Sequence, residues 1–245
     1  MRKWSLLVLL TVIATMGHAG SIVASLTQGS FSNLNLTTQG TIDWAVWGQG
    51  SSISLSPTDD KSGGTAISDL TLVGADNLRG LGVFGTYGET TFQWTNGTNS
   101  PSASNVDAGL QHNGTVATPE GFSFTVTAAT TPEELIVYDT LNYGVATLSA
   151  TLSDGGSILQ TMNLYNSNVP YYSVIDFEAN STGQTLTVTL ELTADTSGND
   201  SGNAALTGVS LSSNQSMDFS SVPEPATLTL FATSLVGLIA RRFKR

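Results

Sequence analysis

The sequence predicts an all-β protein, a two-sheet antiparallel β-sandwich that is jelly-roll-like in its many short strands. Short runs of alternating apolar and polar residues recur along the chain, with Gly, Asn, Asp and Ser between them. Helical periodicity is missing between the two ends of the sequence. Charged residues make up only 11% of the chain, against about 25% in average domains. Hydroxyl and amide side chains, which favour strands and turns, take their place.

Ten segments carry the strand pattern: 41–47, 67–73, 91–95, 122–127, 135–138, 145–152, 158–164, 172–178, 185–192 and 204–211. In 185–192, TLTVTLEL, the leucines and Val188 share one face, as in a strand with one face buried. Asp154-Gly155-Gly156 is typical of a tight hairpin.

We expect a core that contains the residues with the strictest alternation, which are Leu186, Val188, Leu190, Trp44 and Val46. Trp44 shares its face with Ile42 and Val46, so we expect Trp44 to be a core residue.

The first residues, 1–19, have the pattern of a secretory signal peptide. Arg2 and Lys3 are basic, 6–16 is a short apolar run, and Gly17-His18-Ala19 supplies small residues for cleavage after Ala19. Cleavage after Ala24 and an uncleaved membrane anchor are the alternatives. We therefore expect an N-terminal signal helix, recognised by the general secretion machinery.

The last residues combine a stiff tripeptide, a short apolar run and a basic end. Pro223-Glu224-Pro225 disfavours a helix. The uncharged run 226–240 would form a short transmembrane helix of about 22 Å, less than the hydrocarbon thickness of about 30 Å. The positive-inside rule keeps the basic end in the cytoplasm and predicts that the rest of the protein lies outside. The basic residues are Arg241, Arg242, Lys244 and Arg245.

This tail resembles the PEP-CTERM sorting signal of surface proteins in Gram-negative bacteria. The resemblance implies recognition by exosortase, a membrane protease-transpeptidase that cuts near Pro223-Glu224-Pro225. It also implies a transient stay in the inner membrane, then a place at the cell surface or outside the cell, in association with exopolysaccharide and biofilm. An ordinary C-terminal membrane anchor is the alternative.

The expected organisation is a signal peptide (1–19), a sandwich domain (20–211), a polar stalk (212–222) and the sorting signal (223–245). Residues 20–222 contain two Lys or Arg against eighteen Asp or Glu, a net charge of −16. Such a surface repels phosphate backbones, so nucleic-acid binding is excluded. The chain has no cysteine, which excludes disulfides and thiolate chemistry.

The stretch TIDWAVWGQG at 41–50, with KSGG at 61–64 and FQWTNGT at 92–98, is similar to a sandwich domain of secreted bacterial proteins, and this resemblance implies a fold without agreed catalytic residues. Trp47 and Trp94 are candidates for stacking on sugars if their rings are exposed. The alternative is that both are core aromatics, because Trp is highly buried on average.

Catalytic signals are weak. His112 follows the predicted signal peptide in a loop-like GLQHNGT, where we expect it to be exposed. Asp176 and Glu178 share a strand face and are candidates for a hydrolytic acid pair. Calcium is a candidate ligand of Asp195, Asn199 and Asp200 and of Asp59-Asp60, although the same residues also serve as turn formers.

We therefore expect no enzyme and no obligatory cofactor, but an exported, exosortase-sorted protein of the cell surface or extracellular matrix. The alternatives are a carbohydrate-binding module, or a secreted hydrolase that acts on glycans.

Overall fold

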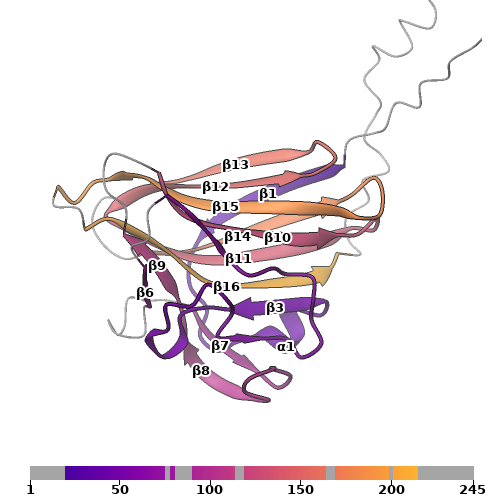
Figure 1. Ribbon diagram of the computed structural model, residues 1–245, viewed down its shortest axis with the longest axis horizontal. Helices are drawn as coiled ribbons and strands as arrows, with labels where there is room; N and C mark the ends of the chain where they lie inside the picture. Colours follow the sequence, from indigo (N-terminus) through magenta and orange to yellow (C-terminus); the bar gives the residue numbers. More distant parts are fainter. Residues whose placement is uncertain are drawn as a thin grey trace, which may run out of the picture.

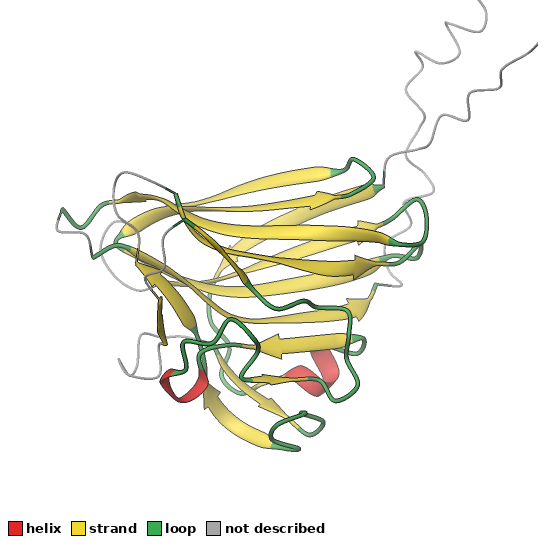
Figure 2. Cartoon of the chain, viewed as in Figure 1, coloured by secondary structure: helices red, strands yellow, loops and turns green. Residues whose placement is uncertain are grey.

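The computed structural model describes residues 20–74, 78–80, 90–113, 119–163, 169–198 and 201–214. These residues form mostly antiparallel β-strands with little helix (Figure 2), as the sequence predicts. The predicted signal helix and C-terminal helix lie outside the described residues. Within the described part of the chain, no helix has the length and apolar character needed to span a membrane.

Three sheets make up the described structure. Sheet I has the strand order β1-β14-β11-β16-β3-β4, with β9 on β16 and β6 on β9; sheet II has the order β13-β12-β15-β10-β5; sheet III has the order β2-β7-β8. The bounds of the elements are β1 Ser21–Gln28, β2 Leu34–Asn35, α1 Leu36–Gln39, β3 Asp43–Val46, η1 Gln49–Ser51, β4 Asp59–Asp60, β5 Thr71–Val73, β6 Leu78–Gly80, β7 Thr91–Trp94, β8 Ala103–Asp107, β9 Leu110–Asn113, β10 Glu120–Ala128, β11 Glu133–Asn142, β12 Gly144–Leu152, β13 Ser157–Asn163, β14 Val169–Glu178, β15 Gln184–Asp195 and β16 Asn203–Ser213.

The sheets stack in the order II, I, III, so that sheet I lies in the middle (Figure 1). Sheets I and II form the expected sandwich. The two-sheet prediction is incomplete, however, because sheet III and α1 cover part of the outer face of sheet I. The β2–β7 pairing in sheet III is parallel, while the other described strand pairs are antiparallel.

All ten predicted segments contain a strand, and the hairpin at Asp154-Gly155-Gly156 joins β12 to β13. Gly155 has a φ of 115°, which L-residues with a side chain rarely adopt. Strand β16 runs to Ser213, two residues beyond the end of the predicted strand segment 204–211. The shorter elements β2, β4, β6, β8 and β9 and the N-terminal strand β1 were not predicted.

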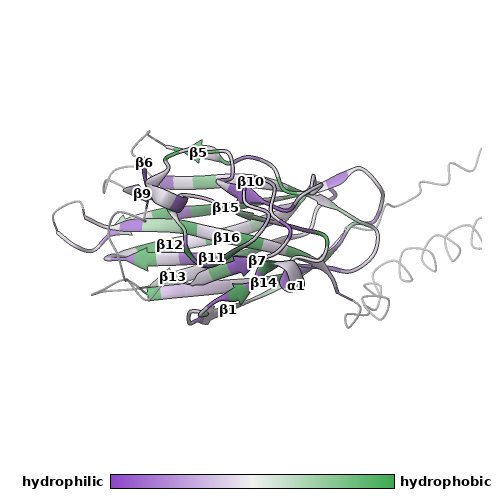
Figure 3. Cartoon of the chain, turned by 90° about the horizontal axis from the view of Figure 1, so that it is seen from below, coloured by the Kyte–Doolittle hydropathy of each residue, from purple (hydrophilic) through white to green (hydrophobic). Residues whose placement is uncertain are grey.

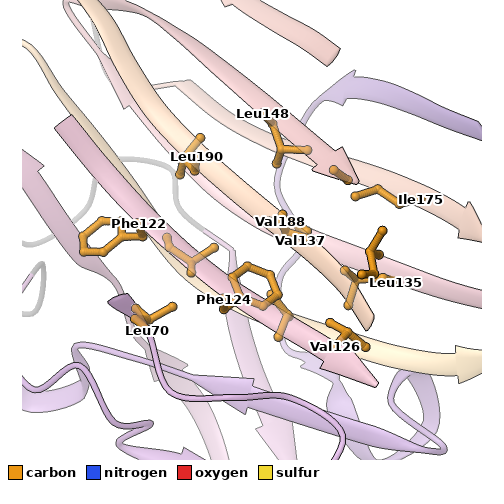
Figure 4. Packing of buried hydrophobic residues seen from close by; sticks show 14 of the residues in the cluster. Leu70, Phe122, Phe124, Val126, Leu135, Val137, Leu148, Ile175, Val188 and Leu190 are labelled. Carbon is orange, nitrogen blue, oxygen red and sulfur yellow. The ribbon is translucent and has the colours of Figure 1, made fainter. Parts of the chain in front are cut away.

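The main core lies between sheets I and II, and Figure 4 shows its apolar side chains from both sheets meeting there. Leu186, Val188 and Leu190 belong to it, as predicted, with at most 2% of each exposed. Apolar and polar residues alternate along these strands (Figure 3), because successive side chains point to opposite faces. This burial of apolar surface is the dominant favourable contribution to folding.

A second, aromatic core lies between sheet I and sheet III. It contains Leu36, Trp44, Val46, Phe92, Trp94, Val106, Ala108 and Tyr138. Trp44 and Val46 are therefore buried as predicted, but in a different core from Val188. Ile42, which precedes the first residue of β3, is 36% exposed.

Val188→Asp is expected to prevent folding, because it places an unpaired carboxylate in the main core at a cost of at least about 3–5 kcal/mol. Thr187→Asp is the matched control, since Thr187 is the exposed neighbour on the same strand. Soluble yield and thermal melting followed by circular dichroism measure the effect. Normal yield and melting of Val188→Asp would contradict the assignment of the core.

Candidate functional site

The rings of Trp47 and Trp94 are buried, with 0% and 1% of their surface exposed. Trp47 packs on Phe124 in the main core at a ring distance of 6.2 Å, and its Nε1 donates to the carbonyl of Leu55 at 3.1 Å. The hypothesis that Trp47 is an exposed sugar platform is wrong, because sheet II covers the face to which Trp47 points.

Trp94 faces the aromatic core. Its ring lies 5.1 Å from that of Trp44, and its Nε1 donates to the carbonyl of Ser100 at 2.8 Å. The hypothesis of a stacking platform is wrong for Trp94 as well, because its indole face is taken up by Trp44. Trp residues with satisfied N–H groups inside a core stabilise a fold and leave no face for a sugar.

A groove of about 360 Å³ nevertheless opens beside Trp94, across the three strands of sheet III. Its lining residues are Asn35, Gln93, Trp94, Thr95, Ser102, Ala103 and Ser104. None of these seven is charged, and the side chains of Thr95, Ser102 and Ser104 are exposed. The groove can therefore offer hydroxyl and amide hydrogen bonds to a neutral ligand.

Asp59 belongs to one of the calcium candidates, but the structure uses it to hold a loop. It is fully buried, and its carboxylate accepts the backbone N–H groups of Asn99 at 3.1 Å and Ser100 at 2.8 Å. Buried Asp43 acts in the same way on Ala66 and Ile67, at 2.7 and 3.0 Å. Burial raises the pKa of Asp43 above its ordinary value, and these hydrogen bonds offset only part of that rise.

Asp195 shows the chemistry of a turn. Its carboxylate accepts the N–H groups of Ser197 at 2.6 Å and Gly202 at 3.0 Å. Burial acts to raise the pKa of Asp195, but these hydrogen bonds outweigh it and the pKa is lowered. The other calcium candidates, Asn199 and Asp200, lie outside the described residues. Among the residues that the structure describes, no group of three His, Cys, Asp or Glu could hold a metal ion.

His112 is buried in β9, so the prediction of an exposed loop residue is wrong. Its Nδ1 lies 3.3 Å from Oε2 of Glu120, and its ring meets the edge of Phe122 at 5.9 Å. Because β9 belongs to sheet I and β10 to sheet II, this polar contact links the two sheets at one end of the main core.

Asp139 is another ionisable group in the main core that the sequence analysis missed. It shares the face of Leu135, Val137 and Leu141 on β11, and 2% of it is exposed. Within the described residues, neither carboxyl oxygen has a hydrogen-bond partner. Burial raises the pKa of Asp139 well above its ordinary value, so the neutral acid is strongly favoured in the folded state.

The candidate acid pair Asp176 and Glu178 is half-buried on the outer face of sheet I. There, Asp176 lies directly opposite Glu134 of β11 and accepts a hydrogen bond from the side-chain amide of Asn214. Burial and then the Asp176 charge raise the pKa of Glu134. The structure thus brings Asp176 together with Glu134, an acid that the sequence analysis did not select.

The sorting residues Pro223, Glu224 and Pro225 and the basic residues 241–245 lie outside the described residues. A family model for the PEP-CTERM protein-sorting motif matches residues 221–245. The chain therefore carries a sorting motif that indicates export and processing by exosortase. No curated protein sequence matches the chain.

Several solved structures are similar in part. The enzymatically active domain of tailspike protein 4 from bacteriophage CBA120 has 14% identity and a TM-score of 0.37, over 66% of this chain and 22% of the tailspike chain. A family 16 carbohydrate-binding module has 12% identity and a TM-score of 0.31, over 43% and 76%. The module TmCBM61, solved with β-1,4-galactotriose, has 13% identity and a TM-score of 0.30, over 45% and 72%. At these scores the similarities assign neither a ligand nor an activity to this chain.

Replacing Asp139 by Asn is expected to stabilise the protein increasingly as the pH rises. Below the ordinary Asp value of 3.8 the group is protonated in both the folded and the unfolded state. Above it the unfolded chain loses the proton first, so the wild type loses stability as the pH rises toward the raised folded pKa. The gain should therefore be larger at pH 8 than at pH 4.

Urea unfolding between pH 4 and pH 8 measures this difference. Asp69→Asn removes the same charge from an exposed position and is the control for the general effect of net charge. Equal effects of the two substitutions at every pH would contradict a titrating carboxyl in the core.

Proposed function

We propose that the protein is a non-enzymatic component of the bacterial cell surface or extracellular matrix. The general secretion machinery exports it, exosortase sorts it through its tail, and the β-sandwich is the part that functions outside the cell. The single observation that carries this proposal is the PEP-CTERM protein-sorting motif in residues 221–245. The exopolysaccharide association implied by the resemblance belongs to the same proposal.

The described structure is compatible with this route in two respects. Strand β1 begins at Ser21, so cleavage after Ala19 leaves it whole, whereas cleavage after Ala24 removes half of its pairs with β14. The chain has no cysteine, so the fold is stabilised without disulfides. Its stability comes from the two hydrophobic cores and from the buried carboxylates of Asp43 and Asp59, which accept hydrogen bonds from loop N–H groups.

Replacing Pro223-Glu224-Pro225 by three alanines is expected to block processing, because the protease loses its motif and the segment gains helix propensity. The uncut protein should then be retained in the inner membrane. Alanines at Gln215, Ser216 and Met217 change the preceding polar stretch and serve as the control. Cell fractionation and intact-mass spectrometry of the surface-released protein give the readout. Mature, correctly localised protein that still carries Arg245 would overturn the sorting proposal.

A second candidate function is binding of a neutral polysaccharide, and the groove on sheet III favours it. Three exposed hydroxyl side chains and the amide groups of Asn35 and Gln93 line this groove without any charge. The hydroxyl groups of a neutral polysaccharide can form hydrogen bonds with such a lining. Stacking on Trp47 or Trp94 is not part of this mode, because both rings are buried.

Ser104→Arg is expected to fill the groove and to lower polysaccharide affinity at least about tenfold, or about 1.4 kcal/mol. Thr151→Arg, exposed on the outer face of sheet II, is the control with the same added side chain. Retention on cellulose, galactan and dextran measures binding by the mature protein. No retention by the wild type, or equal retention by both variants, would remove this candidate.

A further inference from the structure

Two long strands at one margin of the sandwich have an open hydrogen-bonding edge. Within the described residues, β1 pairs only with β14 and β13 pairs only with β12. Their sequences are SIVASLTQ and SILQTMN, eight and seven residues without Pro, Gly or a charged side chain. Every second residue of such an edge directs its N–H and C=O groups away from the sheet, where another strand can bind them.

The opposite margin differs. Figure 3 shows β1 and β13 along one side of the sandwich and β5, β6 and β9 along the other. There the strands β4, β5 and β6 have only two or three residues each. Short strands, charges and prolines are the usual protection of an edge against pairing. The β1–β13 margin has none of them.

This margin also leaves apolar surface uncovered. Ile22, Ala24 and Leu26 of β1 and Ile158 of β13 pack against the main core but are only partly buried. On the outer faces, Val23 is 45% exposed and Leu159 is 69% exposed. Of the five large apolar side chains that are exposed in the described residues, these two lie on the two edge strands. A second molecule bound along this margin would bury them.

We propose that the occupant is a second copy of this chain, with β1 of one copy pairing antiparallel with β1 of the other about a two-fold axis. Charge argues for a second copy. Residues 20–222 have a net charge of −16, so most faces of two copies repel each other. The strands β1 and β13 carry no charge, so the copies can approach along this margin without placing strand carboxylates opposite each other. A basic partner would instead bind the acidic faces of the molecule, because β1 and β13 offer it no opposite charge.

The geometry allows both sheets to take part. The two strands begin at the same corner, since a Cβ atom added to Gly156 would lie 2.8 Å from the carbonyl oxygen of Gly20. A two-fold axis perpendicular to the sheets then brings β1 to its symmetry mate, and β13 to its own. Such an isologous contact is the commonest arrangement in homo-oligomers.

The mature protein is expected to dimerise with rising concentration, which sedimentation velocity between about 1 µM and about 500 µM detects. Val23→Lys should raise the dimer dissociation constant at least tenfold, because it replaces an apolar side chain of the interface with a charged one that pairing would have to desolvate. The variant should still fold, because Asp176 lies opposite Val23 on β14 and its carboxylate can pair with the new lysine within one copy. Thr187→Lys, on the outer face of β15, should leave dimerisation unchanged.

Cysteine cross-linking tests the register independently, since the chain has no cysteine of its own. Single cysteines at Val23, Ser25 and Thr27 lie on the outer face of β1, and the one nearest the two-fold axis should give an oxidised dimer. Cysteine at Thr187 is the control. A monomer at all concentrations, or cross-linking no stronger on β1 than at Thr187, would overturn the proposal. Neither outcome bears on the sorting tail.

Discussion

Strand β3 contributes side chains to both hydrophobic cores, and much of the structure depends on this sharing. Trp44 and Val46 enter the aromatic core, while Ala45 and the adjoining Trp47 enter the main core. A strand that is buried on both faces keeps its place only if the loops around it are fixed. The carboxylates of Asp43 and Asp59 fix them, since each accepts backbone N–H groups from a loop that would otherwise leave its donors unpaired. Two buried acids are thus part of the support for two buried tryptophans.

The alternation of apolar residues was enough to find ten strands and part of the main core, because burial of one face imposes a period of two. It could not show that β3 is covered on both faces, by sheet II on one and by sheet III on the other. For that reason Trp47 and Trp94 were candidates for exposed rings, although both are core residues. His112 was missed for a related reason. The segment around it is polar and becomes a strand by pairing with 78–80 and 203–206, both distant in the sequence. Asp139 lies within a run that alternates well, but nothing in its neighbours distinguishes an acid in the core from one at the surface.

Buried polar groups in the main core differ in how they are satisfied. Glu120 lies close to His112 from the opposite sheet, whereas Asp139 lies on the apolar face of β11 opposite Tyr171, and burial raises its pKa. The contribution of Asp139 to stability therefore falls as the pH rises above the ordinary Asp pKa. Much of the polar surface consists of hydroxyl and amide side chains. Sheet III can therefore form an uncharged groove even in a chain with so many acids.

The strand topology brings the two ends of the described chain together. Ser21 pairs with Glu178, while Phe177 pairs with Glu133, which in turn pairs with Ser213. Both ends of the described chain therefore leave sheet I at the same end of the sandwich. An antiparallel β1 pair about a two-fold axis turns one copy end for end relative to the other, so the chain ends of the two copies would lie at opposite ends of the shared sheet. Pairing of the β1 edges thus leaves the chain ends of each copy outside the interface.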